Sequence, residues 1–403
     1  MKILHFIETL GSGGAERLLV TLLPELARQG IEVELAVQHP PLELKVDLEA
    51  LGIKVHILPK RRKWALFGAS RDLSRLAHKQ DVDVVHAHLY FPTIITAIAC
   101  WFGMFQGASH ATFHNLAYLG ANKRTWKLAL RRLLAGFLVR RGIDRPQAVS
   151  QVSADHYMQA YGLRNIIVIH NAIDFSLLSA VNALQGDALV LPGRMVPEKG
   201  HMDLIVALGQ MSAPYPPVIF AGDGPLRQQL EEEIAKAGLP ITVTGRLPYT
   251  KMLATIAAAR LVIIPSRYEG FGLTALEALA LGKPVIASTA GGLSEVMGNL
   301  GRSVPPGDHA ALRQAINEAL VDVDWIKSQK IMGPAHAAQF AVSTIAARQI
   351  ALYQQTHSEK GSANGRSALH FLHRSDGSAG SKPSASVCSR SWKKRPSDDG
   401  TEF

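Results

Sequence analysis

The residues best suited to chemistry in this chain are two glutamates, Glu269 and Glu277, which lie on either side of a glycine-rich turn. A carboxylate has two acceptor oxygens and fits a pair of neighbouring hydroxyl groups. Between them, Gly270 and Gly272 open a predicted helix, whose first backbone N–H groups are unpaired and lie at the positive end of its dipole. That helix end suits a diphosphate. A diphosphate with a diol at each end describes a nucleotide sugar. Taken alone, the glutamates also fit a turn position and a solvated helix position.

A second group of charges lies in the loop 193–200. Arg194 has a fork-shaped guanidinium and Lys199 a point charge, and glycines bound the loop on both sides. Such a pair suits a diphosphate, to which each charge-assisted hydrogen bond contributes roughly 1.5–3 kcal/mol. The contribution is larger for a leaving group that gains charge. Solvated loop charges are the structural alternative.

The first loop of the chain is also rich in glycine, with Gly11, Gly13 and Gly14 close together. Their spacing fits neither G-x-G-x-x-G nor G-K-[ST], so the loop is neither a dinucleotide fingerprint nor a P-loop. The glycines are compatible with a close approach of the backbone to a phosphate. They are equally compatible with a tight turn from strand to helix.

Three histidines belong to predicted strands or follow them. His114 comes at the end of a strand, where ligands bind in parallel sheets; the alternative is a capped loop histidine. His86 and His88 alternate along a strand and therefore share one face. They are compatible with a metal pair, but no third ligand lies nearby in the sequence, which favours a structural role. Asp81 and Asp83 precede this strand, so we interpret them as its solvated start and not as a metal-binding pair.

Glu269 and Glu277, with seven residues between them, resemble the E-x7-E element of the retaining GT-B glycosyltransferases, in particular their family four. The run 193–200 resembles the G-R-x-x-x-x-K-G element of that family, and the run 13–17 resembles its first loop. The motifs fall in the order of the family. The resemblance covers about residues 1–356.

The resemblance implies a role for each matched residue. Glu277 would bind the ribose of the donor, and Glu269, with the amides after it, would hold the sugar and its phosphates. The implied catalytic residues are His114, which contacts the donor sugar, Arg194 and Lys199, which neutralise the departing diphosphate, and Glu269. The implied donor-binding residues are Gly13, Gly14, Arg194, Lys199, Arg246, Leu247, Glu269, Gly270, Phe271, Gly272, Leu273, Thr274 and Glu277. Arg246 and Leu247 would border the base through their backbone. No metal ligand is expected if Arg194, Lys199 and the helix start at 272–274 carry the phosphate charge. No cofactor is expected, because the nucleotide sugar is the substrate.

Strands and helices alternate along the chain and place these residues at strand ends. Around the two glutamates, 261–264 predicts a buried strand, 273–281 a helix and 285–287 the next strand. The first residues show the same order, with a strand over 2–7 and a helix over 18–29. This pattern predicts an α/β fold of the GT-B type, with two doubly wound Rossmann-like domains facing a cleft.

The chain divides into two expected domains and a tail. We expect an N-terminal, acceptor-side domain over 1–170 and a C-terminal, nucleotide-sugar-binding domain over 171–335. A helix over 336–356 would return to the first domain. Residues 357–403 are rich in serine and show little apolar periodicity, which predicts a low-complexity, disordered tail.

Composition is typical of a globular protein, with 47% apolar and 19% charged residues among 403. The longest apolar run, 89–105, is shorter than the ~20 residues that cross a bilayer, and the first residues have too short an apolar core for a signal peptide. We therefore expect a cytoplasmic protein. Two cysteines, Cys100 and Cys388, exclude a disulfide framework. The net charge of +10 indicates an anionic partner.

Residues 122–141 predict a basic amphipathic helix, with seven Lys or Arg and no acidic residue. Large apolar side chains recur in it at helical spacing: Trp126, Leu130, Leu133, Leu134 and Phe137. Such a helix either lies on an anionic membrane surface or binds an acidic acceptor. Alternatively, the apolar stripe faces the core and the basic face is solvated. Nucleic acid is not expected as a partner, because no recognisable binding motif accompanies the charge.

Together these features predict a retaining glycosyltransferase that moves a sugar from a UDP- or GDP-linked donor to a hydroxyl group. The acceptor would be a lipid-linked or cell-surface saccharide, met at the inner face of the cell membrane. One alternative is an inactive nucleotide-binding partner of a polysaccharide assembly complex, and the other is a nucleotide-sugar epimerase of the same fold. The intact Glu269, Glu277, Arg194 and Lys199 argue against the first. The context of the two motifs argues against the second.

Overall fold

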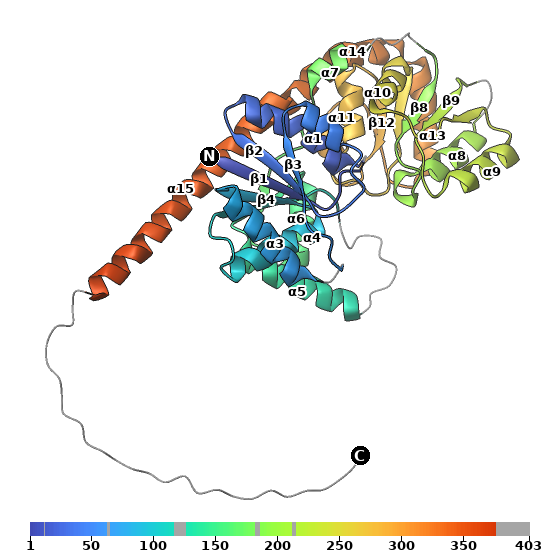
Figure 1. Ribbon diagram of the computed structural model, residues 1–403. Coiled ribbons are helices and arrows are strands. Elements are labelled where there is room, and N and C mark those ends of the chain that lie inside the picture. The colour runs from blue at the N-terminus through green and yellow to red at the C-terminus, as the bar shows by residue number, and fades with distance from the viewer. Residues whose placement is uncertain (12, 63–64, 117–125, 182–185, 212–214, 376–403) are drawn as a thin grey trace, which may run out of the picture. The chain divides into compact units, whose positions relative to one another are not determined.

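The computed structural model describes residues 1–11, 13–62, 65–116, 126–181, 186–211 and 215–375. Met1–Ser358 form one compact unit and Glu359–Phe403 a second. The first unit contains two sheets, one in each half of the chain (Figure 1). All strand pairs within the two sheets are parallel, which confirms the predicted pair of doubly wound Rossmann-like sheets.

The sheet of the first half has the strand order β3-β2-β1-β4-β5-β6-β7. Its strands are β1 Lys2–Ile7, β2 Glu32–Val37, β3 Lys54–Ile57, β4 Val84–His88, β5 Ala108–Phe113, β6 Arg145–Ala148 and β7 Ile167–Val168. The order reverses between β1 and β4, and ligands of such sheets bind at the carboxyl ends of the strands around this point. The first glycine loop follows β1 and His114 follows β5. Both therefore lie at the edge where a ligand is expected.

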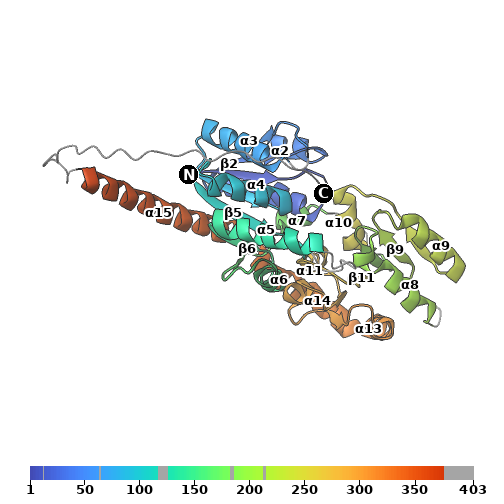
Figure 2. The same ribbon diagram turned by 90° about the horizontal axis from the view of Figure 1, so that it is seen from below.

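Helices cover both faces of this sheet. They are α1 Gly14–Arg28, α2 Lys45–Ala50, α3 Leu66–Lys79, α4 Tyr90–Trp101, α5 Trp126–Gly142 and α6 Gln151–Tyr161. The short helix α7 Phe175–Ser179 packs instead against the core of the second half. In β1, Ile3 and Ile7 share a core with α1 and with the last helix, α15, whereas Leu4 and Phe6 pack with α3 and α4. The helix α5 contacts both α4 and α6 (Figure 2). The helix expected over 18–29 begins earlier, at Gly14.

The sheet of the second half has the order β10-β9-β8-β11-β12-β13. Its strands are β8 Leu189–Pro192, β9 Val218–Ala221, β10 Ile241–Val243, β11 Leu261–Ile264, β12 Val285–Ser288 and β13 Arg302–Val304. The helices are η1 Pro197–Lys199, α8 His201–Gly209, α9 Arg227–Ala237, α10 Tyr249–Ala258, α11 Leu273–Ala280, α12 Leu293–Met297 and α13 His309–Val321. The strand, helix and strand predicted around the two glutamates are confirmed as β11, α11 and β12.

The last helices differ from the prediction. Residues His336 and Ala337 end α14 (Val323–Ala337), and η2 (Ala338–Phe340) follows. The returning helix α15 begins only at Val342 because Ala341 is extended and pairs with Ile173. Among the described residues, no helix combines the length and the apolar character that a bilayer crossing requires.

The predicted disordered tail is wrong over 357–375, because α15 runs from Val342 to Ser375. The sequence contains no proline between Val342 and Pro383 to stop the helix. Buried residues of its first turns, such as Ile345 and Tyr353, anchor it, and each further residue then adds one backbone hydrogen bond. Residues 376–403 of the predicted tail lie outside the described residues.

Candidate functional site

The loop between β11 and α11 lies against the first half of the chain. Gly272 has a φ of 109°, a left-handed conformation that favours glycine. At Gly270, a Cβ atom would lie 2.3 Å from the backbone oxygen of His114. The carbonyl of Gly270 accepts hydrogen bonds from the hydroxyls of Ser150 (2.7 Å) and Ser153 (3.2 Å). These contacts place the loop beside His114, as the predicted site requires.

The residues after Gly272 present a helix N-terminus at this loop. Leu273 and Thr274 form the start of α11 and are half-buried, and Phe271 before them is buried in the core of the second half. The first N–H groups of a helix have no partner within it and carry partial positive charge. Phe271 therefore anchors the loop, while the amides at 272–274 are the groups suited to a diphosphate.

Two of the predicted catalytic residues are in direct contact. The ammonium of Lys199 donates to a carboxylate oxygen of Glu269 at 2.6 Å, and the hydroxyl of Ser266 lies 3.4 Å from the same oxygen. Gly200 has a φ of 72°, and a Cβ there would lie 2.1 Å from the carbonyl oxygen of Pro265. Gly200 thus lets the loop of Lys199 pack against the loop of Glu269.

Arg194 lies in the same loop as Lys199 but differs from it in surroundings. Its side chain is exposed. In the part of the chain that the structure describes, it pairs with no acidic side chain. The predicted pair of cations is therefore one lysine that a carboxylate already holds and one arginine that faces solvent.

The second glutamate, Glu277, is surrounded by groups from both halves. The hydroxyl of Tyr249 donates to its carboxylate at 2.8 Å, and the guanidinium of Arg17 lies 4.6 Å from the centre of the Tyr249 ring. Burial raises the pKa of Glu277 to about 7, although Tyr249 and Arg17 act in the opposite direction. At neutral pH the carboxyl group is therefore close to half protonated. The sequence analysis assigned no role to Arg17 or Tyr249, because no motif indicates that either residue lies beside Glu277.

The two ring nitrogens of His114 differ in their surroundings. Its Nε2 lies 2.9 Å from Nδ1 of His88, whereas its Nδ1 is buried without a hydrogen-bond partner among the described residues. Burial lowers the pKa of His114 to about 4, so the ring is neutral at physiological pH. A buried nitrogen without a partner is unusual and leaves one hydrogen bond for a ligand to make.

The first glycine loop contacts α11. Gly13 precedes α1 and Gly14 is its first residue, and a Cβ at Gly14 would lie 3.6 Å from Leu273. Neither glycine has a positive φ, so neither is required by backbone conformation. They bring a second helix start, that of α1, to the loop that holds Glu269.

The residues predicted to border the base lie between the two halves. The exposed guanidinium of Arg246 forms an ion pair with Glu43 of the first half, and Leu247 is half-buried against the core of the second half. The side chain of Arg246 is thus engaged by protein.

The structure corrects one expectation about metal ligands. No third ligand lies near His86 and His88 in the sequence, but in the fold His5 of β1 lies beside them, and one nitrogen of each of the three rings lies within 4.8 Å of the others. The reason is the strand order, because β1 and β4 are neighbours and His5 pairs in register with His86. Sequence distance concealed this contact.

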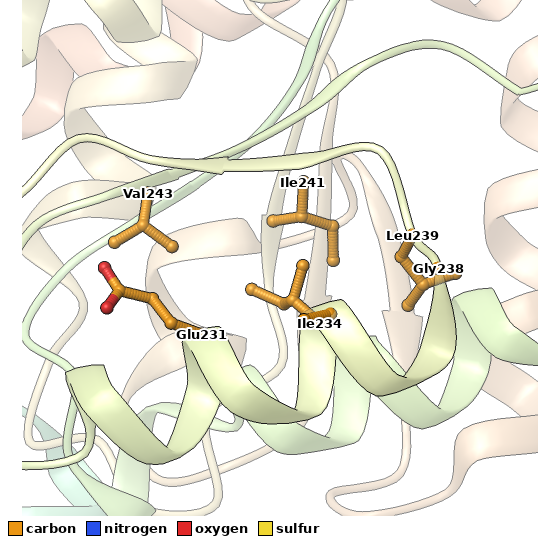
Figure 3. A pocket seen from close by; sticks show the side chains of 7 residues that line it. Glu231, Ile234, Gly238, Leu239, Ile241 and Val243 are labelled. Atoms are coloured by element: carbon orange, nitrogen blue, oxygen red, sulfur yellow. The ribbon is translucent and has the colours of Figure 1, made fainter.

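A hollow of about 300 Å³ lies elsewhere, between α9 and β10 (Figure 3). Its lining is apolar except for Glu231. It contains none of the predicted site residues, and a single carboxylate does not suit a diphosphate. It therefore has no part in the predicted donor site.

Two family models match the chain one after the other. The model "Glycosyltransferase Family 4" matches residues 12–177, and the model "Glycosyl transferases group 1" matches residues 181–336. Their border, between 177 and 181, lies at the end of α7 and before β8, between the two sheets.

Curated relatives and solved structures agree with these matches. The chain is 36% identical to a glycogen synthase of Mycobacterium tuberculosis over 170 residues, 40% of this chain and 41% of that protein. The chain thus spans less than half the length of this relative. It is 27% identical to an MMP alpha-(1->4)-mannosyltransferase of Mycolicibacterium hassiacum over 78% of this chain and 80% of that protein. The solved Anabaena protein Alr3699/HepE, in complex with UDP and glucose, is similar with a TM-score of 0.75 and 25% identity, over 88% of this chain and 99% of that one.

Proposed function

Since the chain belongs to the group 1 glycosyltransferases of the GT-B fold, we propose that it transfers a sugar from a UDP-linked donor to a hydroxyl group of a saccharide. The observation that carries the proposal is the contact between Lys199 and Glu269 beside the start of α11. A cation for the diphosphate and a carboxylate for sugar hydroxyls then lie next to free helix amides. UDP is favoured because the similar Anabaena protein was solved with UDP and with UDP-glucose.

In the proposed reaction the sugar retains its configuration. The acceptor hydroxyl attacks the anomeric carbon from the face that the diphosphate leaves, and a diphosphate oxygen accepts the hydroxyl proton. Arg194, Lys199 and the amides of α11 stabilise the negative charge on the departing diphosphate. Because these groups balance that charge, we propose a transfer that needs no metal ion. Glu269 binds sugar hydroxyls and forms no covalent bond, unlike the nucleophile of a retaining glycosidase.

The donor site is tested by thermal unfolding with UDP, GDP and ADP. A ligand at a hundredfold excess over its Kd raises the free energy of unfolding by about 2.7 kcal/mol. We expect UDP to raise the melting temperature of the native chain and of Glu232→Ala, an exposed control on α9, but not of Glu277→Ala. The absence of a shift with every nucleotide would refute the donor site. Transfer from UDP-glucose, measured as UDP release, tests the reaction itself.

The acceptor side of the proposal rests on α5. Its large apolar residues point to solvent, with Trp126 71% and Leu133 66% exposed, and Leu130, Leu134 and Phe137 exposed as well. The buried residues of the helix are instead Ala135, Gly136, Val139 and Gly142. The alternative of a core-facing stripe is therefore wrong for the described residues 126–141; residues 122–125 lie outside them.

The reason lies in the small residues of α5. A Cβ at Gly136 would lie 2.7 Å from the backbone of Tyr161, and a Cβ at Gly142 would lie 2.0 Å from the backbone of Ala97. The glycines let α5 pack closely on α4 and α6. The small face is thus buried, and the large apolar face is left outside.

Aromatic residues of neighbouring segments extend this exposed face. The ring of Trp101 lies 5.2 Å from that of Phe137 and 4.8 Å from that of Phe102, which in turn lies 5.4 Å from Phe67. We call the set Phe67, Trp101, Phe102, Trp126, Leu130, Leu133, Leu134 and Phe137 the α5 surface. Exposed basic residues on the same helix accompany it, among them Lys127, Arg132 and Arg141, and α5 has no acidic residue.

We propose that the α5 surface lies on an anionic membrane, where the acceptor is a lipid-linked saccharide. Large exposed apolar patches mark interaction sites, and aromatic and basic side chains together suit the boundary between lipid headgroups and acyl chains. The proposed location is the inner face of the cell membrane.

Flotation with liposomes tests this partner. The double variant Leu133→Glu with Leu134→Glu should lose binding to vesicles of anionic lipid. The control Val321→Glu with Ile331→Glu, which changes two exposed apolar residues of the second half, should keep it. Binding by neither the native chain nor the control would remove the membrane from the proposal. Binding to neutral vesicles alone would remove the role of the basic residues.

A further inference from the structure

A row of polar side chains lies on one face of the first sheet, under α15. Alternate residues of β1, β4 and β5 point to this face, and neighbouring strands hold His5 opposite His86 and His88 opposite Thr112. Tyr353 of α15 lies over them and is fully buried. Burial of so many polar rings is unfavourable unless each finds a hydrogen-bond partner.

The partners form one continuous chain that begins at the site. Nε2 of His114 lies 2.9 Å from Nδ1 of His88, and Nε2 of His88 lies 2.9 Å from Nδ1 of His5. Nε2 of His5 lies 3.3 Å from the hydroxyl of Tyr353, which lies 2.5 Å from Nδ1 of His86. Nε2 of His86 lies 2.7 Å from the hydroxyl of Thr112 and ends the chain.

All four rings in this chain are neutral. Burial lowers the pKa of His5 to about 3 and that of His114 to about 4, and it holds the pKa values of His86 and His88 well below the ordinary value. A neutral imidazole has one N–H and one bare nitrogen. Each ring must therefore donate on one side and accept on the other, so the direction of any one hydrogen bond sets the direction of all.

The phenol of Tyr353 decides this direction, because it has a single proton and two histidine neighbours. The shorter contact, to His86, takes the proton. His5 then donates to the phenol oxygen, His88 donates to His5, and His114 donates from Nε2 to His88. This order leaves Nδ1 of His114, the buried nitrogen without a partner, as a bare acceptor.

We propose that Tyr353 is a positioning residue that fixes the tautomer of His114 through His5 and His88, so that Nδ1 accepts a hydrogen bond from a donor-sugar hydroxyl. This inference rests on the proposed transfer reaction, which supplies the sugar. It gives α15 a part in the site, although three hydrogen bonds separate Tyr353 from His114.

A metal ion at His5, His86 and His88 is the competing explanation for the cluster. Hydrogen bonds already engage all six nitrogens of these three rings. A metal would have to displace at least two of these bonds. The three ligands would also bring no negative charge to balance a buried dication. The observed contacts therefore favour the hydrogen-bonded chain.

The test is ¹⁵N NMR of the full chain with labelled histidines, because a bare ring nitrogen and an N–H nitrogen have well-separated shifts. In the native protein, Nδ1 of His114 should have the shift of a bare nitrogen. Tyr353→Phe should mix the two tautomers of His114 and lower kcat/KM by about threefold to tenfold, the range for one neutral hydrogen bond. Thr356→Val is the matched control. It removes a buried hydroxyl from the same helix, but that hydroxyl contacts His110, outside the chain.

A second variant acts from the far end of the chain and leaves α15 intact. Thr112→Val removes the acceptor for the Nε2–H of His86. A buried N–H without a partner costs more free energy than a buried bare nitrogen without one. Because the reversed chain would instead place an N–H without a partner on Nδ1 of His114, the two directions become similar in free energy, and His114 should show a mixture of its two tautomers. Unchanged His114 shifts in both variants, or an equal change in Thr356→Val, would overturn the proposal. So would stoichiometric zinc in the purified native protein that is lost in His5→Ala. Because the shifts are measured without substrate, a failure of the relay is distinguished from a failure of the transfer reaction.

Discussion

Glu277→Gln should make the protein more stable at alkaline pH while it weakens binding of the donor. The carboxyl group of Glu277 has its pKa raised from 4.5 to about 7, chiefly by burial. In the folded state it holds its proton up to about pH 7, whereas in the unfolded chain it releases the proton near pH 4.5. A raised pKa of this kind gives stability that is present below the unfolded value and is lost as pH rises through the folded value.

The size of the loss follows from the two pKa values. Each pH unit between them is worth about 1.4 kcal/mol, and the two-state linkage relation gives a loss of about 2.5 kcal/mol between pH 5 and pH 8. Glutamine has no proton to release, and its side-chain oxygen still accepts the hydrogen bond from Tyr249. Glu277→Gln should therefore avoid this loss.

The assay is urea unfolding of the native chain and of Glu277→Gln at pH 5 and pH 8. Between pH 5 and pH 8, the free energy of unfolding of the variant should rise by about 2.5 kcal/mol relative to that of the native chain. Its affinity for UDP should fall, because an amide offers one acceptor oxygen to the ribose where the carboxylate offers two. The control is Glu232→Gln, which makes the same substitution at an exposed residue of α9.

Equal pH dependence in the native chain and in Glu277→Gln would refute the reasoning, since it would mean that Glu277 ionises alike in the folded and unfolded states. The donor would then bind a Glu277 carboxylate whose pKa is the ordinary one. If the reasoning holds, the affinity for UDP should also fall as pH drops below 7, because protonation removes one acceptor oxygen from Glu277.

Lys199→Ala should lower turnover at saturating donor by about a hundredfold, because the lysine stabilises the charge of the leaving group. The control Lys251→Ala, which changes an exposed lysine of α10, should leave turnover unchanged. Unchanged turnover in Lys199→Ala would exclude this role of the lysine. Gly200→Ala should destabilise the fold by about 2–4 kcal/mol in denaturant unfolding, since its left-handed backbone and the carbonyl 2.1 Å from the added Cβ both resist a side chain. Gly209→Ala, in open space on α8, should instead stabilise it by about 0.5–1 kcal/mol, and a similar effect at both positions would show that the contact at Gly200 is not tight.

Local rules were sufficient for the part of the site that lies on one segment. The strand β11, the glycine turn and the helix α11 follow one another within 261–280, and each is determined by neighbours in sequence: an apolar run, a glycine with positive φ, a run of helix formers. The predicted bounds therefore agree with the structure to within one residue. The family motifs assigned Lys199 and Glu269 to one donor, and in the structure the two residues are in contact.

Tertiary contacts set what the sequence could not predict. The periodicity of α5 marked an apolar stripe but carried no sign of whether the stripe faces protein or solvent; the close packing of Gly136 and Gly142 decided it. His5 is a lone histidine in an apolar strand, and only the order of β1, β4 and β5 brings it to His88. Tyr353 lies on the last helix, more than two hundred residues away from His86 in the chain.

The charges of the site are arranged by function. Burial disfavours the charged forms of Glu277 and His114, the two groups suited to the ribose and the sugar. The groups suited to the diphosphate, Arg194 and Lys199, lie in exposed and half-buried positions. Glu269 stands between the two sets, because it holds Lys199 at 2.6 Å.

This position of Glu269 implies an exchange when the donor binds. A diphosphate carries more negative charge than one carboxylate and attracts the same ammonium more strongly. We expect Lys199 to turn from Glu269 to the diphosphate, which frees the carboxylate oxygens for sugar hydroxyls. The free nucleotide should then weaken the contact between Lys199 and Glu269 as the complete donor does, but only the complete donor gives Glu269 a new partner. Glu269→Gln should therefore cost more affinity for UDP-glucose than for UDP, whereas equal losses would place Glu269 at the phosphates.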